Sequence, residues 1–312
     1  MEAWGKNSRE DFMNRIEKEL EKIGCEYKSL FSMSRYTSMR VGGLADLVVY
    51  PKSHLELMIV LNLLTSLNFP WTILGGGSNT IIDDSGINGA VVSTKKMRGI
   101  KIQGSGKVIA EAGAVLGTIL NKTIRVELTG FEFAAGIPGT VGGGVFMNAG
   151  ANDGEIKDVV QNVWIWLNGK EVMLSRGELK FEYRKSYLPE GSVVTRVMFG
   201  LTRGNRKESE RRVKDYLDKR SETQPITNSN SGSIFKNPPE IPAGMLLEQL
   251  GFKGYQIGRA KFSEVHANFI VNSGGASASD VLKLIDAAKK EAFLRTGMLL
   301  ETEVKIIGQE NS

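Results

Sequence analysis

Cysteine and histidine are scarce in this chain. Its 312 residues include one cysteine, Cys25, and two histidines, His54 and His266. A single cysteine excludes an internal disulfide, and so few thiols and imidazoles provide no cluster of the kind that binds zinc. We therefore expect neither a structural nor a catalytic metal ion.

Long apolar runs are also missing. No stretch approaches the ~18 consecutive apolar residues that a membrane-spanning helix needs. The segment from Met1 to Gly5 lacks the charged region and following apolar core of a secretory signal. We therefore expect a cytoplasmic protein without a membrane partner.

Basic residues slightly outnumber acidic ones. The net charge of +5 is compatible with nucleic acid or with an anionic small substrate as the partner. In the most basic segment, residues 203–220, acidic residues alternate with basic ones at helical spacing. This pattern is typical of a solvated helix face with internal salt bridges. We therefore expect no nucleic-acid partner and favour the small substrate.

Glycine, by contrast, is concentrated in two runs. The first glycine run, residues 74–79, reads Leu-Gly-Gly-Gly-Ser-Asn, and the second, residues 130–150, contains seven glycines. Glycine inside a helix or strand costs about 0.5–1 kcal/mol relative to alanine, so it gathers where the backbone turns or lies against something else. Apolar residues within the second run argue against a flexible linker. Two such runs indicate one large, flat or phosphate-bearing ligand.

Neither run matches a common nucleotide motif. Both the dinucleotide pattern Gly-x-Gly-x-x-Gly and the phosphate-loop pattern Gly-x4-Gly-Lys-Ser/Thr are absent. The backbone N–H groups of Gly75 to Asn79 can still form a concave nest for a pyrophosphate, with the Ser78 hydroxyl and the Asn79 amide as further donors. A plain tight turn is the alternative, and the presence of two runs favours the anion site.

The first two thirds of the chain predict mixed helix and strand. A chain of this length suggests two or three compact units. We expect a helix over 8–23, then a β-α-β unit: a strand at 45–50, a helix capped by Ser53 and ending near 67, and a strand at 71–74. Further strands are predicted at 90–93, 108–112, 162–167 and 193–201, with a helix over 114–126. A hairpin at Asn168-Gly169 is expected between the last two strands.

A charged helix starting near 205 indicates a boundary. After it we predict helices at 243–250 and 277–296, and strands at 268–271 and 303–307. Residues 299–304 alternate, which puts Glu301 and Glu303 on one face of a strand. If that face points inward, one carboxylate is buried and available for chemistry; if outward, both are merely solvated.

Two further segments carry candidate chemistry. Residues 230–238 place the Ser233 hydroxyl, the Lys236 ammonium and the Asn237 amide close to a glycine, and an ordinary polar turn is an equally good interpretation. Residues 181–186 include Arg184, whose guanidinium fork could hold a carboxylate substrate. Without such a substrate the same segment is only a basic turn.

Eight motifs in order resemble one family, the UDP-N-acetylenolpyruvoylglucosamine reductases, which are flavoenzymes of peptidoglycan synthesis. The resemblance covers residues 30–308. The motifs are Tyr36-Thr-Ser-Met-Arg-Val-Gly-Gly43, the run 74–79, Gly136-Ile-Pro-Gly-Thr-Val-Gly-Gly143, Asn148-Ala-Gly150, Tyr183-Arg184-x-Ser186, Gly232-Ser-Ile-Phe-Lys-Asn-Pro238, Ser263-x-x-His266-Ala-Asn268 and Leu300-Glu-x-Glu303-Val.

The resemblance implies an α+β fold. It consists of a lead-in at 1–34, a vanillyl-alcohol-oxidase-like (PCMH-type) FAD-binding domain in two lobes at 35–204, and a C-terminal substrate-binding domain at 205–312. FAD would lie extended, its pyrophosphate at 75–79 and its isoalloxazine near 136–150. Binding would be non-covalent, because neither glycine run contains histidine or cysteine. The implied cofactor contacts are Arg40, Gly42, Gly75, Gly76, Gly77, Ser78, Asn79, Gly136, Ile137, Pro138, Gly139, Thr140, Gly142, Gly143, Asn148, Ala149 and Gly150.

The resemblance also implies the reaction. NADPH reduces the flavin and leaves, and UDP-N-acetylglucosamine enolpyruvate takes its place and is reduced to UDP-N-acetylmuramate. Arg184 would hold the substrate carboxylate, Glu303 would stabilise the enol, and Ser233 would protonate C2. Contacts to the sugar or diphosphate would come from Tyr183, Arg220, Lys236 and Asn237. We expect the enzyme to act as a monomer.

One spacing departs from the longer variant of the family. Only 48 residues separate Arg184 from Ser233, too few for the additional tyrosine-bearing subdomain of that variant. The chain therefore resembles the shorter type, in which another element must close over the substrate, with Arg220 as a candidate. Two alternatives are another FAD-dependent oxidoreductase of the superfamily and a catalytically silent UDP-sugar-binding protein.

Overall fold

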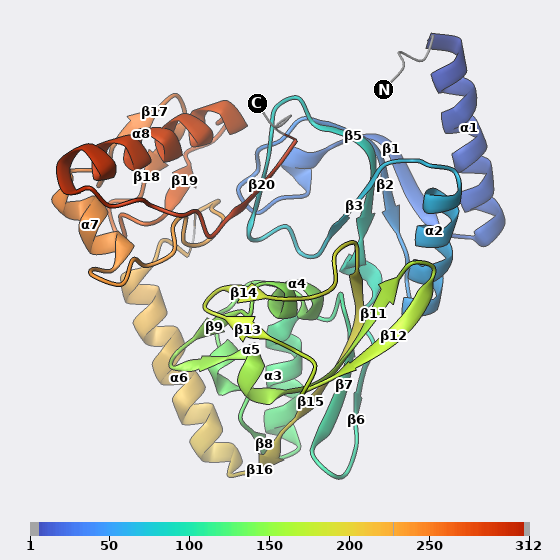
Figure 1. Ribbon diagram of the computed structural model, residues 1–312. Coiled ribbons are helices and arrows are strands. Elements are labelled where there is room, and N and C mark those ends of the chain that lie inside the picture. The colour runs from blue at the N-terminus through green and yellow to red at the C-terminus, as the bar shows by residue number, and fades with distance from the viewer. Residues whose placement is uncertain (1–5, 227, 309–312) are drawn as a thin grey trace.

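The computed structural model describes residues 6–226 and 228–308 and has three parts (Figure 1). The first lobe begins with helix α1 (Lys6–Ile23) and contains a four-stranded sheet of order β1-β2-β5-β3. The second lobe contains a five-stranded antiparallel sheet, and the C-terminal part follows helix α6 (Arg206–Thr223). Helix and strand are mixed throughout, as the α+β prediction requires.

The predicted β-α-β unit forms the centre of the first lobe. Strand β2 (Leu44–Tyr50), helix α2 (His54–Ser66) and strand β3 (Trp71–Leu74) follow one another, and both strands pair in parallel with β5 (Ile87–Ser93). The Ser53 side chain caps α2 by accepting a hydrogen bond from the Glu56 backbone N–H at 3.2 Å. Strand β1 (Glu26–Ser32), which the sequence did not predict, pairs antiparallel with β2.

The second lobe is built on the sheet β12-β11-β15-β7-β6. Its strands are β6 (Ile100–Ile102), β7 (Lys107–Glu111), β11 (Val160–Leu167), β12 (Lys170–Ser175) and β15 (Val193–Gly200). Helix α4 (Val141–Phe146) packs on β7 and β15, and helices α3 (Leu116–Arg125) and α5 (Ile156–Val159) complete the lobe. Short two-stranded ribbons surround the sheet: β9 (Gly150–Ala151) with β10 (Gly154–Glu155), β13 (Phe181–Glu182) with β14 (Lys185–Ser186), and β8 (Leu128–Thr129) with β16 (Thr202–Arg203).

The hairpin at Asn168-Gly169 connects different strands from those predicted. It joins β11 to β12, so the expectation that it lies between 162–167 and 193–201 was wrong. Asn168 (φ 48°) and Gly169 (φ 85°) both have left-handed backbone, as a two-residue hairpin of this type requires. Strand β12 escaped prediction because most of its residues are partly or fully exposed, so no apolar alternation marks it.

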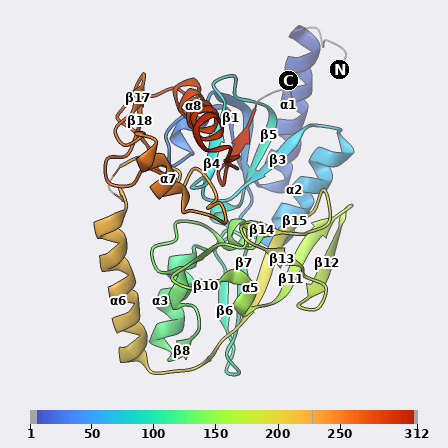
Figure 2. The same ribbon diagram turned by 60° about the vertical axis from the view of Figure 1, so that its left-hand side comes forward.

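The C-terminal part contains helices α7 (Ala243–Gln249) and α8 (Ala278–Thr296) with the small sheet β17 (Gln256–Ile257), β18 (Ala260–Phe262) and β19 (Ile270–Asn272). In both views helix α6 runs along the second lobe toward this part, and it contacts α3 (Figure 2). The chain then returns to the first lobe, where β20 (Lys305–Ile307) pairs in parallel with β4 (Thr80–Ile82). This return carries residues of the last motif to the edge of the first glycine run.

The two lobes share one hydrophobic core. Buried residues of α2, including Leu57, Val60 and Leu61, belong to the same cluster as Val163 and Val197 of the second sheet. A separate cluster fills the C-terminal part and includes Met39 and Val41 of the first lobe. Continuous apolar packing therefore fixes the position of one lobe against the other, and with it the two glycine runs.

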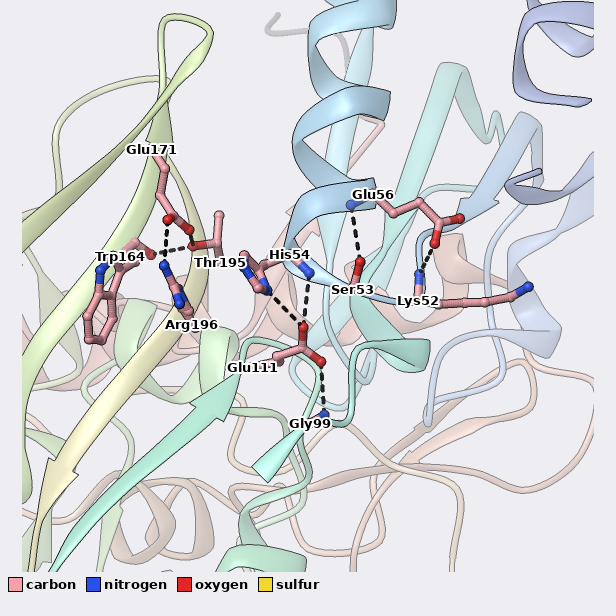
Figure 3. A network of polar contacts seen from close by, with 10 residues as sticks. All are labelled: Lys52, Ser53, His54, Glu56, Gly99, Glu111, Trp164, Glu171, Thr195 and Arg196. Carbon is pink, nitrogen blue, oxygen red and sulfur yellow. Dashed lines mark hydrogen bonds and ion pairs between the residues drawn. The ribbon is translucent and has the colours of Figure 1, made fainter. Parts of the chain in front are cut away.

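A polar network also joins the lobes (Figure 3). At the end of β7, Glu111 accepts hydrogen bonds from the backbone N–H groups of His54 at 3.0 Å and Gly99 at 2.9 Å, and its Oε1 lies 3.2 Å from the His54 Nδ1. Beside it, Arg196 Nη2 donates to Glu171 Oε2 at 2.7 Å. Glu111 thus ties the start of α2 to the end of strand β7 in the second sheet.

The described part of the chain contains neither a membrane-spanning helix nor a metal-binding cluster. No described helix combines the length and apolar character that crossing a bilayer demands. Within residues 6–226 and 228–308, acidic, cysteine and histidine side chains nowhere gather in threes around a space fit for a metal ion.

Candidate active site

A cavity of about 620 Å³ lies between the two glycine runs. Residues 74–79 line one side and residues 137–150 supply much of the other. The C-terminal part contributes Ser231, Gly232, Ser233 and Phe269, and the segment before β20 contributes Glu303. Three regions far apart in the sequence therefore meet around one space.

The two glycine runs touch directly. A Cβ added to Gly75 would lie only 2.4 Å from Thr140 Oγ1, so a side chain at position 75 does not fit. Ser78 Oγ donates a hydrogen bond to Pro138 O at 2.7 Å. The absence of side chains at Gly75 thus lets the second run approach the first.

Three carbonyl groups of the first glycine run accept hydrogen bonds from neighbouring segments. The Tyr36 hydroxyl donates to Gly75 O at 2.6 Å, and the Ser38 backbone N–H donates to Gly77 O at 3.0 Å. On the other side, the Lys305 backbone N–H donates to Asn79 O at 3.0 Å. These contacts fix the loop in one shape.

The N–H groups of the same run remain available. Within the part of the chain that the structure describes, the backbone N–H groups of Gly75 to Asn79 donate to no protein acceptor. The five residues line the cavity, which is the position that an anion nest requires. The predicted side-chain donors are engaged elsewhere: Ser78 bonds Pro138 O, and Asn79 Nδ2 donates to Glu303 O at 3.2 Å. The backbone is therefore the main source of donors.

Four residues of the cavity wall carry buried polar atoms with no hydrogen-bond partner among residues 6–226 and 228–308. These atoms are Thr140 Oγ1, Ser192 Oγ, Gln224 Oε1 and Ser231 Oγ. Buried polar atoms in folded proteins are nearly always bonded, because leaving one unsatisfied costs about 1–3 kcal/mol. The wall is thus suited to a ligand that carries several polar groups along its length.

The rest of the wall is apolar. Ile73, Leu116, Ile137, Val193 and Val194 line the cavity beside the glycines. An extended molecule with a flat ring system at one end and a pyrophosphate in the middle, such as FAD, fits this combination of apolar wall, bare backbone and free N–H groups. None of the described residues that line the cavity is histidine or cysteine.

Arg184, Ser233 and Glu303 all line this cavity, as the sequence predicts. Arg184 occupies the turn between β13 and β14 with φ 54°, and its Nε donates to Glu303 Oε1 at 3.0 Å. Its Nη2 donates to Gly150 O at 2.8 Å. The guanidinium thus joins the second glycine run to the C-terminal carboxylate.

Burial raises the pKa of the Glu303 carboxyl, although the charges of Arg184 and Lys236 act in the opposite direction. The side chain is 19% exposed. A carboxyl group with a raised pKa can keep its proton closer to neutral pH and donate a hydrogen bond. Glu303 is therefore equipped to stabilise negative charge that develops in the cavity.

The expectation that Glu301 and Glu303 share one face of a strand was wrong. Strand β20 starts only at Lys305, and Glu303 lies in a bend. Its backbone N–H donates to Ile234 O at 2.8 Å, whereas Lys305 bonds Asn79 on another segment. The change of partner breaks the alternation, so Glu301 is 72% exposed and pairs with Lys236 while Glu303 points into the cavity.

The predicted substrate residues have different positions. Arg220 lines the main cavity beside Gly136. Asn237 lines a smaller neighbouring cavity of about 260 Å³, which shares Ser233 with the main one, and its Oδ1 accepts from the Ala243 backbone N–H. Lys236 and Tyr183 line neither cavity; the Tyr183 ring lies under the Arg184 guanidinium at 4.9 Å.

Most predicted cofactor residues line the cavity, but four do not. Arg40, Gly42, Gly136 and Asn148 lie outside its wall. Asn148 is fully buried, and its Nδ2 donates to Glu155 Oε2 and to Glu182 O, both at 3.0 Å. It therefore holds the turn that carries Arg184, and it has no free amide for a ligand.

Several residues of the site were missed from the sequence. Lys305 and Gln224 line the cavity, and Tyr36 supports the first run. No local signal marks Lys305, because the segment changes hydrogen-bond partners between Glu303 and Lys305 and strand alternation does not extend across the change. Gln224 at the end of α6 carries no signal either, since only the fold brings it to the cavity.

Comparison with known proteins identifies both halves of the molecule. Residues 45–179 match the profile of an FAD-binding domain, which confirms the predicted FAD-binding fold and cofactor, and residues 224–307 match the C-terminal domain of UDP-N-acetylenolpyruvoylglucosamine reductase. The reductase of Caldanaerobacter subterraneus subsp. tengcongensis is 44% identical over 280 residues, 89% of this chain and 92% of the relative. That of Clostridium novyi is 41% identical, covering 96% of this chain and 98% of the relative.

A solved structure of a member of this enzyme family has a similar fold. The crystal structure of UDP-N-acetylenolpyruvylglucosamine reductase from Thermus caldophilus superimposes with a TM-score of 0.79 at 34% identity, covering 90% of this chain and 98% of that one. The likeness therefore extends over both lobes and the C-terminal part. The chain belongs to the UDP-N-acetylenolpyruvoylglucosamine reductase family.

Proposed function

We propose that this protein reduces UDP-N-acetylglucosamine enolpyruvate to UDP-N-acetylmuramate with electrons from NADPH, in the cytoplasm and as a step of peptidoglycan precursor synthesis. The observation that carries the proposal is the meeting of Arg184, Ser233 and Glu303 in one cavity with the two glycine runs. A silent binding protein would have no need of a proton donor such as Ser233 on the same cavity as Arg184 and the partly buried Glu303.

The chain's own residues define where the cofactor would lie. The backbone N–H groups of Gly75 to Asn79 would hold the FAD pyrophosphate, and the glycine-rich backbone of the second run would lie against the ring. When bound, FAD supplies the hydride, received from NADPH, that adds to C3 of the enolpyruvyl ether. The cavity contains no histidine or cysteine among its described lining residues, which supports non-covalent binding.

The remaining chemistry belongs to the protein. Addition at C3 places negative charge on C2 and its carboxylate, and Arg184 offers a permanently charged planar fork to that carboxylate. Glu303, with its raised pKa, donates a hydrogen bond to the enol oxygen. Ser233 then gives the proton of its hydroxyl to C2 from a fixed position at the cavity wall.

The substrate's diphosphate and sugar would extend toward the C-terminal part. Arg220 lies on the main cavity, and Asn237 on the smaller cavity that begins at Ser233. Lys236 is 19% exposed and pairs with Glu301, so it would have to exchange that partner to reach a phosphate. Tyr183, stacked on Arg184, would limit the movement of the guanidinium. No additional subdomain is required, and Arg220 on α6 is the proposed closing contact.

The two half-reactions test the proposal separately. Anaerobic NADPH should bleach the oxidised flavin band, and UDP-N-acetylglucosamine enolpyruvate should restore it rapidly. In Ser233→Ala, bleaching by NADPH should persist while recovery slows by roughly 10³-fold, the range for loss of a general acid. Ser229→Ala is the control, because Ser229 lies on the same segment but lines neither cavity.

Other outcomes would contradict specific parts. Normal recovery in Ser233→Ala would remove Ser233 from the mechanism. A flavin that recovers only with oxygen would indicate another oxidase of the superfamily. A protein that binds the UDP-sugar but never holds flavin would indicate a silent binding protein, and a sizing column would separately test the proposed monomer.

A further inference from the structure

Lys95 is a partly buried cation without a carboxylate partner. It lies in the 3-10 turn η2 (Thr94–Lys96) that follows β5. Its Nζ donates to Tyr36 O at 3.0 Å and lies 3.5 Å from the centre of the Tyr36 ring. No ion pair with an acidic side chain involves it among residues 6–226 and 228–308.

Holding this charge in place has a cost. Burial lowers the pKa of the Lys95 ammonium, and no nearby carboxylate opposes the effect. Lysines removed from water are normally paired, because an isolated ammonium loses much of its hydration energy. One carbonyl and one aromatic face compensate only in part. The structure therefore keeps an un-neutralised positive charge at this point.

The position of the charge relates it to the first glycine run. The Tyr36 hydroxyl bonds Gly75 O at 2.6 Å, and Tyr36 O lies 3.1 Å from where a Gly77 Cβ would be. Since Lys95 Nζ is 3.0 Å from the same carbonyl oxygen, it lies within about 6 Å of that Gly77 position. Tyr36 thus stands between the ammonium and the glycine run.

Residues 75–79 line the cavity, whereas Lys95 does not. Among the residues that the structure describes, the backbone N–H groups of Gly75 to Asn79 have no protein acceptor, so they are free to bind an anion. A charge in a low-dielectric setting acts over this distance without contact. The ammonium and the N–H dipoles therefore add to one positive potential at the nest.

We propose that Lys95 is a positioning residue that strengthens binding of the cofactor's pyrophosphate electrostatically, through the glycine run and Tyr36. The proposal rests on the FAD site described above. It differs from a packing role, because the effect must depend on the charge of the ligand and on ionic strength.

The test compares two flavins on the full chain after removal of bound cofactor. FAD carries the pyrophosphate and riboflavin carries no phosphate. Their dissociation constants are measured by fluorescence titration at low and high salt for the wild type, Lys95→Met and Lys95→Arg. Methionine keeps an unbranched apolar stem on the Tyr36 ring, and arginine keeps the charge. Lys96→Met is the control, because Lys96 is exposed and pairs with Glu26.

The expected pattern is specific. Lys95→Met should weaken FAD roughly tenfold at low salt and leave riboflavin within about twofold. The FAD deficit should shrink at high salt, and Lys95→Arg should recover most of the affinity. Lys96→Met should match the wild type.

Other patterns overturn the proposal. Equal losses for both flavins, or a deficit that salt does not change, would mean that Lys95 only supports the fold. Unchanged FAD affinity in Lys95→Met would show that Lys95 has no role in FAD binding. If the wild type itself failed to bind FAD, the cofactor site would be wrong, and this result is distinct from any difference among the variants.

Discussion

Gly75→Ala should weaken FAD binding because it forces the two glycine runs apart. The added Cβ would lie 2.4 Å from Thr140 Oγ1, 1.0 Å inside the 3.4 Å at which ordinary van der Waals contact begins. Threonine is β-branched and stiff at χ1, so its hydroxyl cannot simply turn away. Either the loop or the start of α4 must shift, and both line the cofactor cavity.

The size of the effect follows from the cost of overpacking. Inserting a methyl group into a well-packed place costs typically about 1–3 kcal/mol. In the flavin-free variant the two glycine runs can move apart to make room for the methyl group. FAD binding must bring them back to the wild-type spacing, so the cost appears in the free energy of FAD binding. A penalty of about 1–3 kcal/mol corresponds to an FAD dissociation constant raised roughly 5- to 150-fold. Titration of the flavin-free full chain with FAD measures it directly.

A second substitution checks the reasoning. In Thr140→Ala the hydroxyl is gone, and the nearest remaining atom to a Gly75 Cβ would be the Cβ of residue 140 at an ordinary 3.6 Å. The cost of Gly75→Ala should therefore largely vanish in the double variant, although Thr140→Ala alone loses one hydrogen-bonding group. Additive losses, or an unaffected dissociation constant in Gly75→Ala, would refute the argument.

Two further predictions concern protonation. Burial raises the pKa of Glu303, so its carboxyl holds a proton below that pKa and loses it as pH rises through the pKa. The rate at which substrate reoxidises the flavin should therefore fall at alkaline pH. Glu303→Gln should reoxidise more slowly, and its rate should not show this alkaline fall. For Glu132, burial acts to raise the pKa, but hydrogen bonds from Ser209, Thr129 and Gly130 together lower it. Its stabilisation is therefore present above the ordinary value of 4.5 and is lost as pH falls through the folded value. In urea unfolding, Glu132→Gln should lose about 1–2 kcal/mol at pH 7, and a deficit that persists undiminished at pH 3 would contradict this.

The sequence predicted elements whose apolar pattern follows from local burial. The β-α-β unit around α2 and the long helix α8 appeared where expected, because one buried face and an N-cap serine mark each of them. Strands β1 and β12 were missed because their exposed residues show no alternation. An alternating apolar pattern appears in the sequence only where one face of a strand is buried. An edge strand that is held mainly by backbone hydrogen bonds buries few side chains, so its sequence shows little of this pattern.

Most residues of the candidate site could be named from the sequence, but their contacts could not. Nothing local pairs Arg184 with Glu303, which are 119 residues apart, or directs the Asn148 amide to the Arg184 turn. Glu303 also escaped the alternation rule, because its segment changes partners from Ile234 to Asn79 within two residues. Tertiary pairing decides which of two neighbouring glutamates is buried.

The pairing of β20 with β4 also sets an order of assembly. Strand β4 has β20 as its partner in the described sheets, and β20 lies more than 200 residues later in the chain. Domains fold from the N-terminus as they emerge during synthesis, so both lobes can form around the cofactor space first. Glu303 reaches that space only when the final segment docks. A nascent chain halted before residue 300 therefore lacks both the Glu303 carboxyl and the Lys305 backbone contact to Asn79 that supports the first glycine run.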